Sequence, residues 1–241
     1  MNGIVLARDS YKESDQRVSI LTKQYGKKIY TAKGVKKITS KNSAALGLGN
    51  VVNIGVVAGK ETAYITTVQV INPFFASTHS LPILFSVQHV LVILNRILGA
   101  DQPDMRLYTF MLHWLDFLQN HSDFCPHAVY HFYVHFLDIL GYTFNIPPRI
   151  TDSSSDSLAQ VYVYNFADGL FQKKDTLSAS AERCHGLSGA AISYLHNLSI
   201  GNFLAYSSAI QSELGDFLHE ALVYYTEKPQ HRWDPLFCLV D

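Results

Sequence analysis

The chain has 241 residues, of which 48% are hydrophobic, and it carries a formal net charge of −1. This composition excludes an intrinsically disordered chain and is typical of a globular protein with one large domain or two modest ones. The three cysteines contain no Cys-x-x-Cys pair, which excludes a disulfide framework and favours a reducing, cytoplasmic location: Cys125, Cys184 and Cys238.

The first third of the chain has the pattern of a small β-barrel. Gly26 is expected to have a positive φ in a hairpin turn between the second and third strands. Five strands in a segment of this length match the strand count of an OB-fold. The predicted strands are Gly3–Arg8, Arg17–Lys23, Lys27–Lys33, Asn50–Ala58 and Thr62–Ile71.

After Pro73 the hydrophobic periodicity changes to that of helices. A loop rich in Pro and Ser at Thr143–Asp156 interrupts them, and a short strand is predicted at Val161–Phe166. The uncharged stretch Thr62–Asn95 is broken by polar residues and prolines, so no membrane span is expected. The predicted helices are Leu81–Leu98, Asp104–Asn120, Pro126–Leu140, Ser188–Leu198 and Ile200–Tyr225.

These elements together predict an α+β multidomain fold. An N-terminal five-stranded OB-fold β-barrel is expected over residues 1–76. A mostly α-helical C-terminal domain is expected over residues 77–241, with an irregular insertion near 143–187.

The net charge of −1 hides an uneven distribution. Ten Lys or Arg and only three Asp or Glu lie between Arg8 and Lys41, so the first 72 residues carry +7 and the remaining 169 carry −8. A basic block of this kind is the electrostatic signature of a polyanion-binding surface, and the interleaved tyrosines suit base stacking. The alternative is a solvated basic face.

The first 41 residues contain five short motifs: Gly3-Ile4-Val5-Leu6, Tyr11-x-Glu13-Ser14-Asp15, Leu21-Thr22, Gly26-Lys27 and Ala32-Lys33-Gly34-x-Lys36-Lys37. In their order and spacing these motifs resemble the RecO family of DNA repair and recombination proteins. The resemblance implies an OB-fold that binds single- and double-stranded DNA and a helical C-terminal domain, without enzymatic activity. It also implies strand annealing and, together with the RecR protein, recombinase loading onto DNA coated by single-strand-binding protein.

The chain departs from the family at a zinc site. Many members hold zinc with two Cys-x-x-Cys pairs, which would follow Gly141-Tyr142 and Gly169 here, and neither pair exists. Cys184-His185 is isolated and lacks the partners for a four-ligand structural site. We therefore expect a version without zinc or another cofactor.

The predicted DNA contacts come from the basic block. Lysines favour phosphate attraction over bidentate base readout, so sequence-independent binding is expected. The segment Glu13–Asp15 is interpreted as a turn that hydrogen-bonds backbone amides rather than as a catalytic carboxylate pair. The predicted contact residues are Lys12, Lys27, Lys28, Lys33, Lys36, Lys37 and Lys41, with Tyr11 and Tyr30 as stacking candidates.

Two alternative functions stay open. His127, His131 and His135 are spaced i, i+4, i+8 on one predicted helix, a spacing that metal-binding helices use, so a metal-dependent enzyme is one alternative. The other is an adapter whose basic β-domain binds an acidic protein. The sequence has no GxSxG motif, P-loop or dinucleotide fingerprint that argues for catalysis.

Overall fold

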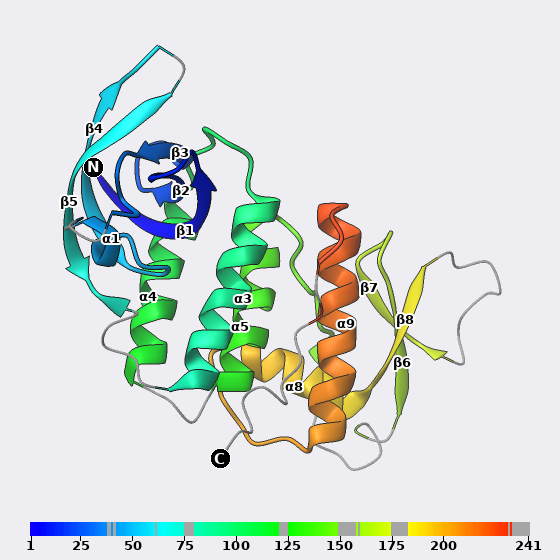
Figure 1. The fold of residues 1–241 in the computed structure, drawn as a ribbon. Helices are drawn as coiled ribbons and strands as arrows, with labels where there is room; N and C mark the ends of the chain where they lie inside the picture. The colour runs from blue at the N-terminus through cyan, green and yellow to red at the C-terminus, as the bar shows by residue number, and fades with distance from the viewer. Residues whose placement is uncertain are drawn as a thin grey trace. The chain divides into compact units, whose positions relative to one another are not determined.

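The structure, a computed structural model, describes residues 1–37, 40, 42–60, 62–74, 80–120, 125–148, 158, 160–174, 183–230 and 232. The chain divides into two compact units, Met1–Cys125 and Pro126–Leu236 (Figure 1). The predicted domain boundary, at residues 76 and 77, lies outside the described residues. Within the described ranges no helix is both long and apolar enough to cross a membrane.

The first unit contains a closed five-stranded barrel with the strand order β1-β2-β3-β5-β4. All neighbouring strands are antiparallel except β3 and β5, which pair in parallel with Thr31 opposite Tyr64. This arrangement confirms the predicted OB-like barrel. The strands are β1 (Asn2–Tyr11), β2 (Asp15–Thr22), β3 (Gly26–Ala32), β4 (Val51–Ala58) and β5 (Ala63–Asn72), with the short helix α1 (Asn42–Ala45) before β4.

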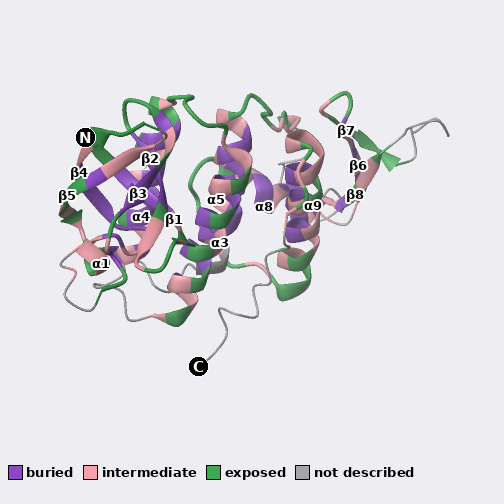
Figure 2. Cartoon of the chain, turned by 45° about the horizontal axis from the view of Figure 1, so that its top comes forward, coloured by how far each residue is buried: buried purple, intermediate pink, exposed green. Residues whose placement is uncertain are grey.

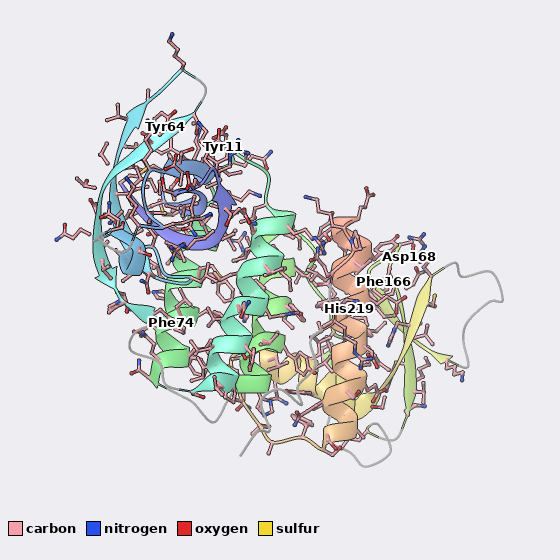
Figure 3. The ribbon with its side chains drawn as sticks, viewed as in Figure 1. Tyr11, Tyr64, Phe74, Phe166, Asp168 and His219 are labelled. Atoms are coloured by element: carbon pink, nitrogen blue, oxygen red, sulfur yellow. The ribbon has the colours of Figure 1, made fainter. Side chains whose placement is uncertain are left out.

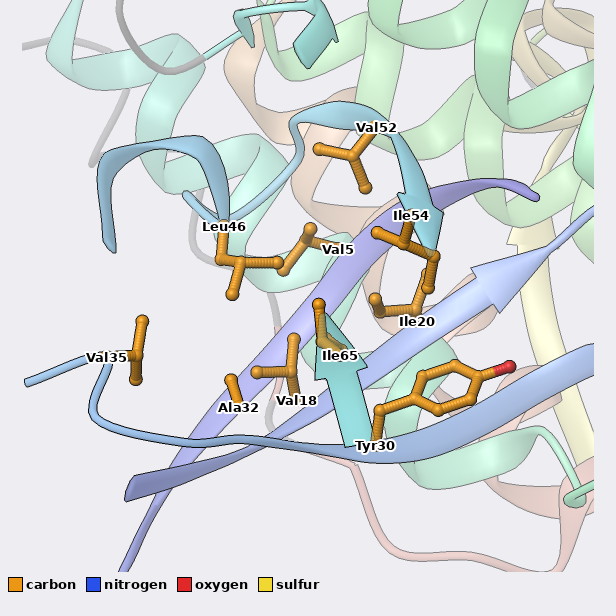
Figure 4. Packing of buried hydrophobic residues seen from close by; sticks show 10 residues of the cluster. All are labelled: Val5, Val18, Ile20, Tyr30, Ala32, Val35, Leu46, Val52, Ile54 and Ile65. Carbon is orange, nitrogen blue, oxygen red and sulfur yellow. The ribbon is translucent and has the colours of Figure 1, made fainter. Parts of the chain in front are cut away.

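β-branched side chains fill the barrel. Val18, Ile20 and Ile54 are at most 1% exposed and pack together inside it (Figure 4). Such side chains fit a pleated surface and contribute about 1.5–3 kcal/mol each when buried. The ring of Tyr30 packs in the same cluster, and its hydroxyl donates to Met1 Sδ at 3.3 Å. Every strand of the barrel contributes at least one side chain to this core.

Two helices belong to the same unit as the barrel: α3 (Leu81–Ile97) and α4 (Met105–Asn120). The side chain of Asn95 on α3 accepts a hydrogen bond from Ser19 Oγ of β2 at 2.7 Å. Asp104 Oδ1 accepts from Leu107 N at 3.0 Å, which confirms that Asp104 caps α4. The burial of these elements can be followed in Figure 2.

The β2–β3 turn fits closely against the connection between these helices. Gly26 has φ +66°, as predicted, and a Cβ there would lie 2.2 Å from the carbonyl oxygen of Gln102. The amide of Asp101 donates to Lys27 O at 3.1 Å. Only glycine satisfies both the backbone conformation and the close approach.

The second unit combines helices with a three-stranded sheet of order β7-β6-β8. Predicted helices and the strand near residue 161 are present, whereas β7 and β8 were not predicted. The last helix begins at Ser208 rather than Ile200, because Gly201 has φ +71° and Ser207 Oγ caps the helix by accepting from Ile210 N. The elements are α5 (Cys125–Ile139), β6 (Val161–Asn165), β7 (Leu170–Lys173), β8 (Cys184–Ser188), α8 (Gly189–Ser199) and α9 (Ser208–Thr226).

An aromatic core holds the sheet of the second unit against α9. Phe217 is 0% exposed, and its ring centre lies 5.2 Å from those of Phe144 and Tyr164. The rings of Phe166 and Phe171 also pack against Phe217. Aromatic pairs of this kind add to the stabilisation from burial.

Candidate nucleic-acid interface

Two cation–π pairs lie on the outer face of the barrel. The guanidinium of Arg17 lies 4.4 Å from the ring centre of Tyr11, and the ammonium of Lys33 lies 4.0 Å from that of Tyr64 (Figure 3). The register connects them, because Arg17 is opposite Thr31 and Thr31 is opposite Tyr64. Adjacent strands are about 4.8 Å apart, so Arg17 and Tyr64 are separated by roughly 10 Å of barrel surface.

The lysine loop, residues 33–37, is held in place by the β1–β2 turn. Asp15 Oδ1 accepts from Gly34 N at 2.8 Å, and Lys36 N donates to Ser14 O at 3.1 Å. Gly34 has φ +65°, a conformation that favours glycine. The acidic turn therefore hydrogen-bonds backbone amides as predicted, and it positions the basic loop.

The exposed charges on this face are mostly positive. Two acidic side chains, Asp9 and Glu13, are also exposed there. A surface with this excess of cations attracts polyanions and concentrates them near the adjoining rings. The exposed basic residues are Lys12, Arg17, Lys33, Lys36 and Lys37.

Two predicted contact residues, Lys27 and Tyr30, are directed to partners within the first unit, and a third, Lys28, is partly exposed but already paired. Lys27 Nζ donates to Asn95 O on α3 at 2.6 Å, and Lys28 forms an ion pair with Asp101. Tyr30 is 5% exposed inside the barrel, so its ring is not available on the outer face. Lys41 lies outside the described residues.

Sequence reasoning missed Arg17 and Tyr64. Tyr64 has no basic residue beside it in the sequence, where its neighbours are Ala63 and Ile65. The parallel pairing of β3 with β5 brings it to Lys33. The spacing of Tyr11 and Arg17 across the β1–β2 hairpin was the one available signal for their contact. Arg8, by contrast, is used structurally, since its guanidinium donates to Gln16 Oε1 and Ser43 O.

The three histidines of α5 are partly buried, and each contacts a neighbouring ring. His127 Nδ1 is hydrogen-bonded to the Tyr194 hydroxyl, and the ring of His131 lies 4.3 Å from that of His135. Burial, followed by the neighbouring His135, lowers the pKa of His131 to about 3. Within the described ranges no group of three or more His, Cys, Asp or Glu side chains is placed to hold a metal.

The segments that follow Gly141-Tyr142 and Gly169, where the sequence has no Cys-x-x-Cys pair, contribute aromatic packing. Tyr164 and Phe171, on paired strands β6 and β7, pack with their ring centres 4.7 Å apart. Cys184 begins β8, and the adjacent His185 contacts Glu220 through Nδ1 at 2.5 Å. Among the described residues, this donor set does not fit a four-ligand zinc site.

Comparison with known proteins identifies two matching sequence families. The family described as Recombination protein O N terminal matches residues 1–74, and Recombination protein O C terminal matches residues 79–234. A DNA repair protein RecO of Geobacter metallireducens is 26% identical over 143 residues, covering 59% of this chain and 58% of the relative. A DNA repair protein RecO of Cutibacterium acnes is 29% identical over 89 residues, covering 37% of this chain and 36% of the relative. The aligned regions thus span less than two thirds of either relative.

Proposed function

Because the chain belongs to the Recombination protein O (RecO) family, we propose that it binds DNA through the outer face of its barrel and acts in recombinational DNA repair. The relatives named DNA repair protein RecO support this role. The proposal assigns no catalytic step to the chain.

The main support for the proposal is that a basic loop and two tyrosines lie on one face of the barrel. Lys36 and Lys37 are exposed on a loop fixed by Asp15, and the Lys33–Tyr64 pair borders that loop. Ammonium groups neutralise phosphates and release counterions, whereas tyrosine rings stack on unpaired bases. The face therefore suits single strands, and its lysines also suit the phosphates of a duplex.

Strand annealing follows from the same chemistry. Two complementary strands repel each other through their phosphates, and partial neutralisation by the lysine loop lowers that repulsion. Lysine contacts read no base edges, so we expect annealing to be independent of sequence. We further propose RecR and single-strand-binding protein as protein partners, with the acidic second unit as a docking platform.

The first test is fluorescence anisotropy with a labelled mixed-sequence single strand at several salt concentrations. The double variant Lys36→Ala/Lys37→Ala removes two phosphate contacts, so affinity at about 0.1 M salt should fall roughly 10- to 30-fold and the salt slope should decrease by about 1.4. The double variant Lys173→Ala/Lys174→Ala, which removes the same charge from the second unit, is the control. Equal affinities of wild type and the Lys36/Lys37 variant would overturn the assignment of the interface.

The alternative is an adapter whose basic face binds an acidic protein. Its support is the same excess of cations, which attracts any polyanion. The two functions differ in the tyrosines, because an acidic peptide gains little from the faces of Tyr11 and Tyr64. Absence of DNA binding by the wild-type chain at low salt would favour the adapter.

A further inference from the structure

An open groove of about 460 Å³ runs along β3 beside the β4–β5 hairpin. Its lining includes Tyr25 and Ile29, which are 49% and 55% exposed, together with Thr62 and Ala63 of the hairpin. Lys28 and Asp101 also line it. The groove therefore has apolar walls and one ion pair.

The groove lies beside the strand positions of the Lys33–Tyr64 pair. Thr62, which lines the groove, lies 3.5 Å (Oγ1 to Oγ1) from Thr31, the residue opposite Tyr64. Ile29 and Lys33 lie on the same outer side of β3 as Thr31. A chain bound against Tyr64 thus has an open path along β3 towards Tyr25. This path differs from the lysine loop, which lies beyond the other end of β3.

The ion pair in the groove is exposed and easily replaced. The side chains of Lys28 and Asp101 are 36% and 61% exposed, and exposed pairs of this kind contribute little stability. Asp101 has φ +63°, an uncommon conformation for a residue other than glycine. Asp101 and Tyr30 both line the groove. Burial of the Tyr30 hydroxyl, and then the negative charge of Asp101, raise the pKa of Tyr30.

We propose that the groove binds a single strand of DNA. In the free protein the Asp101 carboxylate is paired with the Lys28 ammonium, and a phosphate of the bound strand displaces that carboxylate. The proposal rests on the DNA-binding function proposed above. Tyr25 and Ile29 offer apolar contact to the faces of bases. The bases of a single strand can expose these faces, whereas the bases of a duplex are stacked on one another, so the groove suits a single strand. The phosphate replaces the carboxylate on the same ammonium, so Lys28 stays paired, and the released Asp101 carboxylate, 61% exposed, is hydrated by solvent.

Removing the carboxylate tests the displacement step. Asp101→Asn keeps a residue that tolerates positive φ and frees Lys28, so single-strand affinity at low salt should rise about threefold. The salt slope should steepen by up to about 0.7, the value for one further phosphate on a single strand. The matched control is Asp116→Asn, which changes the net charge equally at an exposed position of α4.

Shortening the apolar wall tests the groove itself. Ile29→Ala should weaken single-strand binding severalfold and leave binding of a blunt duplex unchanged. Ile71→Ala is the matched control, because it is an equally exposed isoleucine (52%) of the barrel that does not line the groove. Tyr25→Ala should weaken single-strand binding by about tenfold through lost stacking.

These results distinguish a failure of the proposed DNA-binding function from a failure of the single-strand groove. If the wild type binds no DNA, the proposed function fails and the groove fails with it. If the wild type binds, then an Asp101→Asn variant with unchanged or weaker affinity, or an equal gain in Asp116→Asn, overturns the displacement by itself. Equal losses for single strands and duplexes in Ile29→Ala overturn the single-strand groove.

Discussion

The barrel and helix α5 both carry a repeated titratable side chain, and they use it in opposite ways. Lys36 and Lys37 of the barrel are exposed, with their loop fixed by backbone hydrogen bonds. On α5, the rings of His131 and His135 lie 4.3 Å apart at an angle of 52°, and burial lowers the pKa of both. Spacing alone therefore does not distinguish a binding surface from a partly buried helix face, because burial decides which groups are charged and accessible.

The strongest loss of stability is expected in the aromatic core of the second unit. Phe217→Ala removes a ring that is 0% exposed, and we expect the free energy of unfolding to fall by about 3–5 kcal/mol. Urea denaturation followed by near-ultraviolet circular dichroism measures it. Leu170→Ala, at a position 49% exposed, is the control and should change stability by less than about 0.5 kcal/mol. Equal stability of the Phe217 variant and wild type would contradict the packing described.

The histidines of α5 predict an acid-sensitive fold. His131 stays neutral in the folded chain down to about pH 3, whereas in the unfolded chain it binds a proton below its ordinary pKa of 6.5. The unfolded state thus binds more protons between these values, and stability falls as the pH drops from 6.5 towards 3, by up to about 1.4 kcal/mol per pH unit.

Urea denaturation between pH 7 and pH 4.5 checks this dependence. His131→Phe should flatten the profile, since phenylalanine keeps the contact with Phe203 and does not titrate. The exposed His113 of α4, changed to Gln, provides the control substitution. A profile of His131→Phe that falls as steeply as that of wild type would locate the acid sensitivity elsewhere.

The smallest change in DNA affinity is expected from a substitution of Asp15, which supports the lysine loop. Asp15→Ala removes a negative charge from the DNA-binding face, which by electrostatics alone tightens binding, but it also frees the Gly34 amide that holds the lysine loop. We expect the loss of this hydrogen bond to dominate, with DNA binding weakened about threefold and stability lowered by about 1 kcal/mol. Asp15→Asn keeps an acceptor oxygen and should bind at least as well as wild type. Tighter binding by Asp15→Ala would mean that the loop needs no such support.

Local patterns predicted most of the fold. The barrel strands follow from β-branched runs and the turn at Gly26, and α4 follows from its cap at Asp104. The strands β7 and β8 were missed because they are only four and five residues long and are stabilised by pairing with β6. Their apolar residues are too few to give a periodic signal.

The site was harder to predict than the fold. The sequence indicated that the lysines and Tyr11 form a basic, aromatic face, but it did not show which lysines have internal partners. Lys27 and Lys28 are adjacent to each other, and their partners Asn95 and Asp101 lie about 70 residues further along the chain. Contacts over such a separation depend on how α3 packs against the barrel, which no local pattern reports.

The close fit of Gly26 against Gln102 has a consequence for evolution and for protein production. Any side chain at position 26 requires the 100–102 connection to move, so we expect these two segments to change together among relatives. A fragment that stops at residue 74, where the match to the N-terminal family ends, lacks Asn95 and the 100–102 connection. The smallest fragment that keeps these contacts extends through the 100–102 connection, and the hydrogen bonds between Asn72 of β5 and Gln119 of α4 extend it through α4.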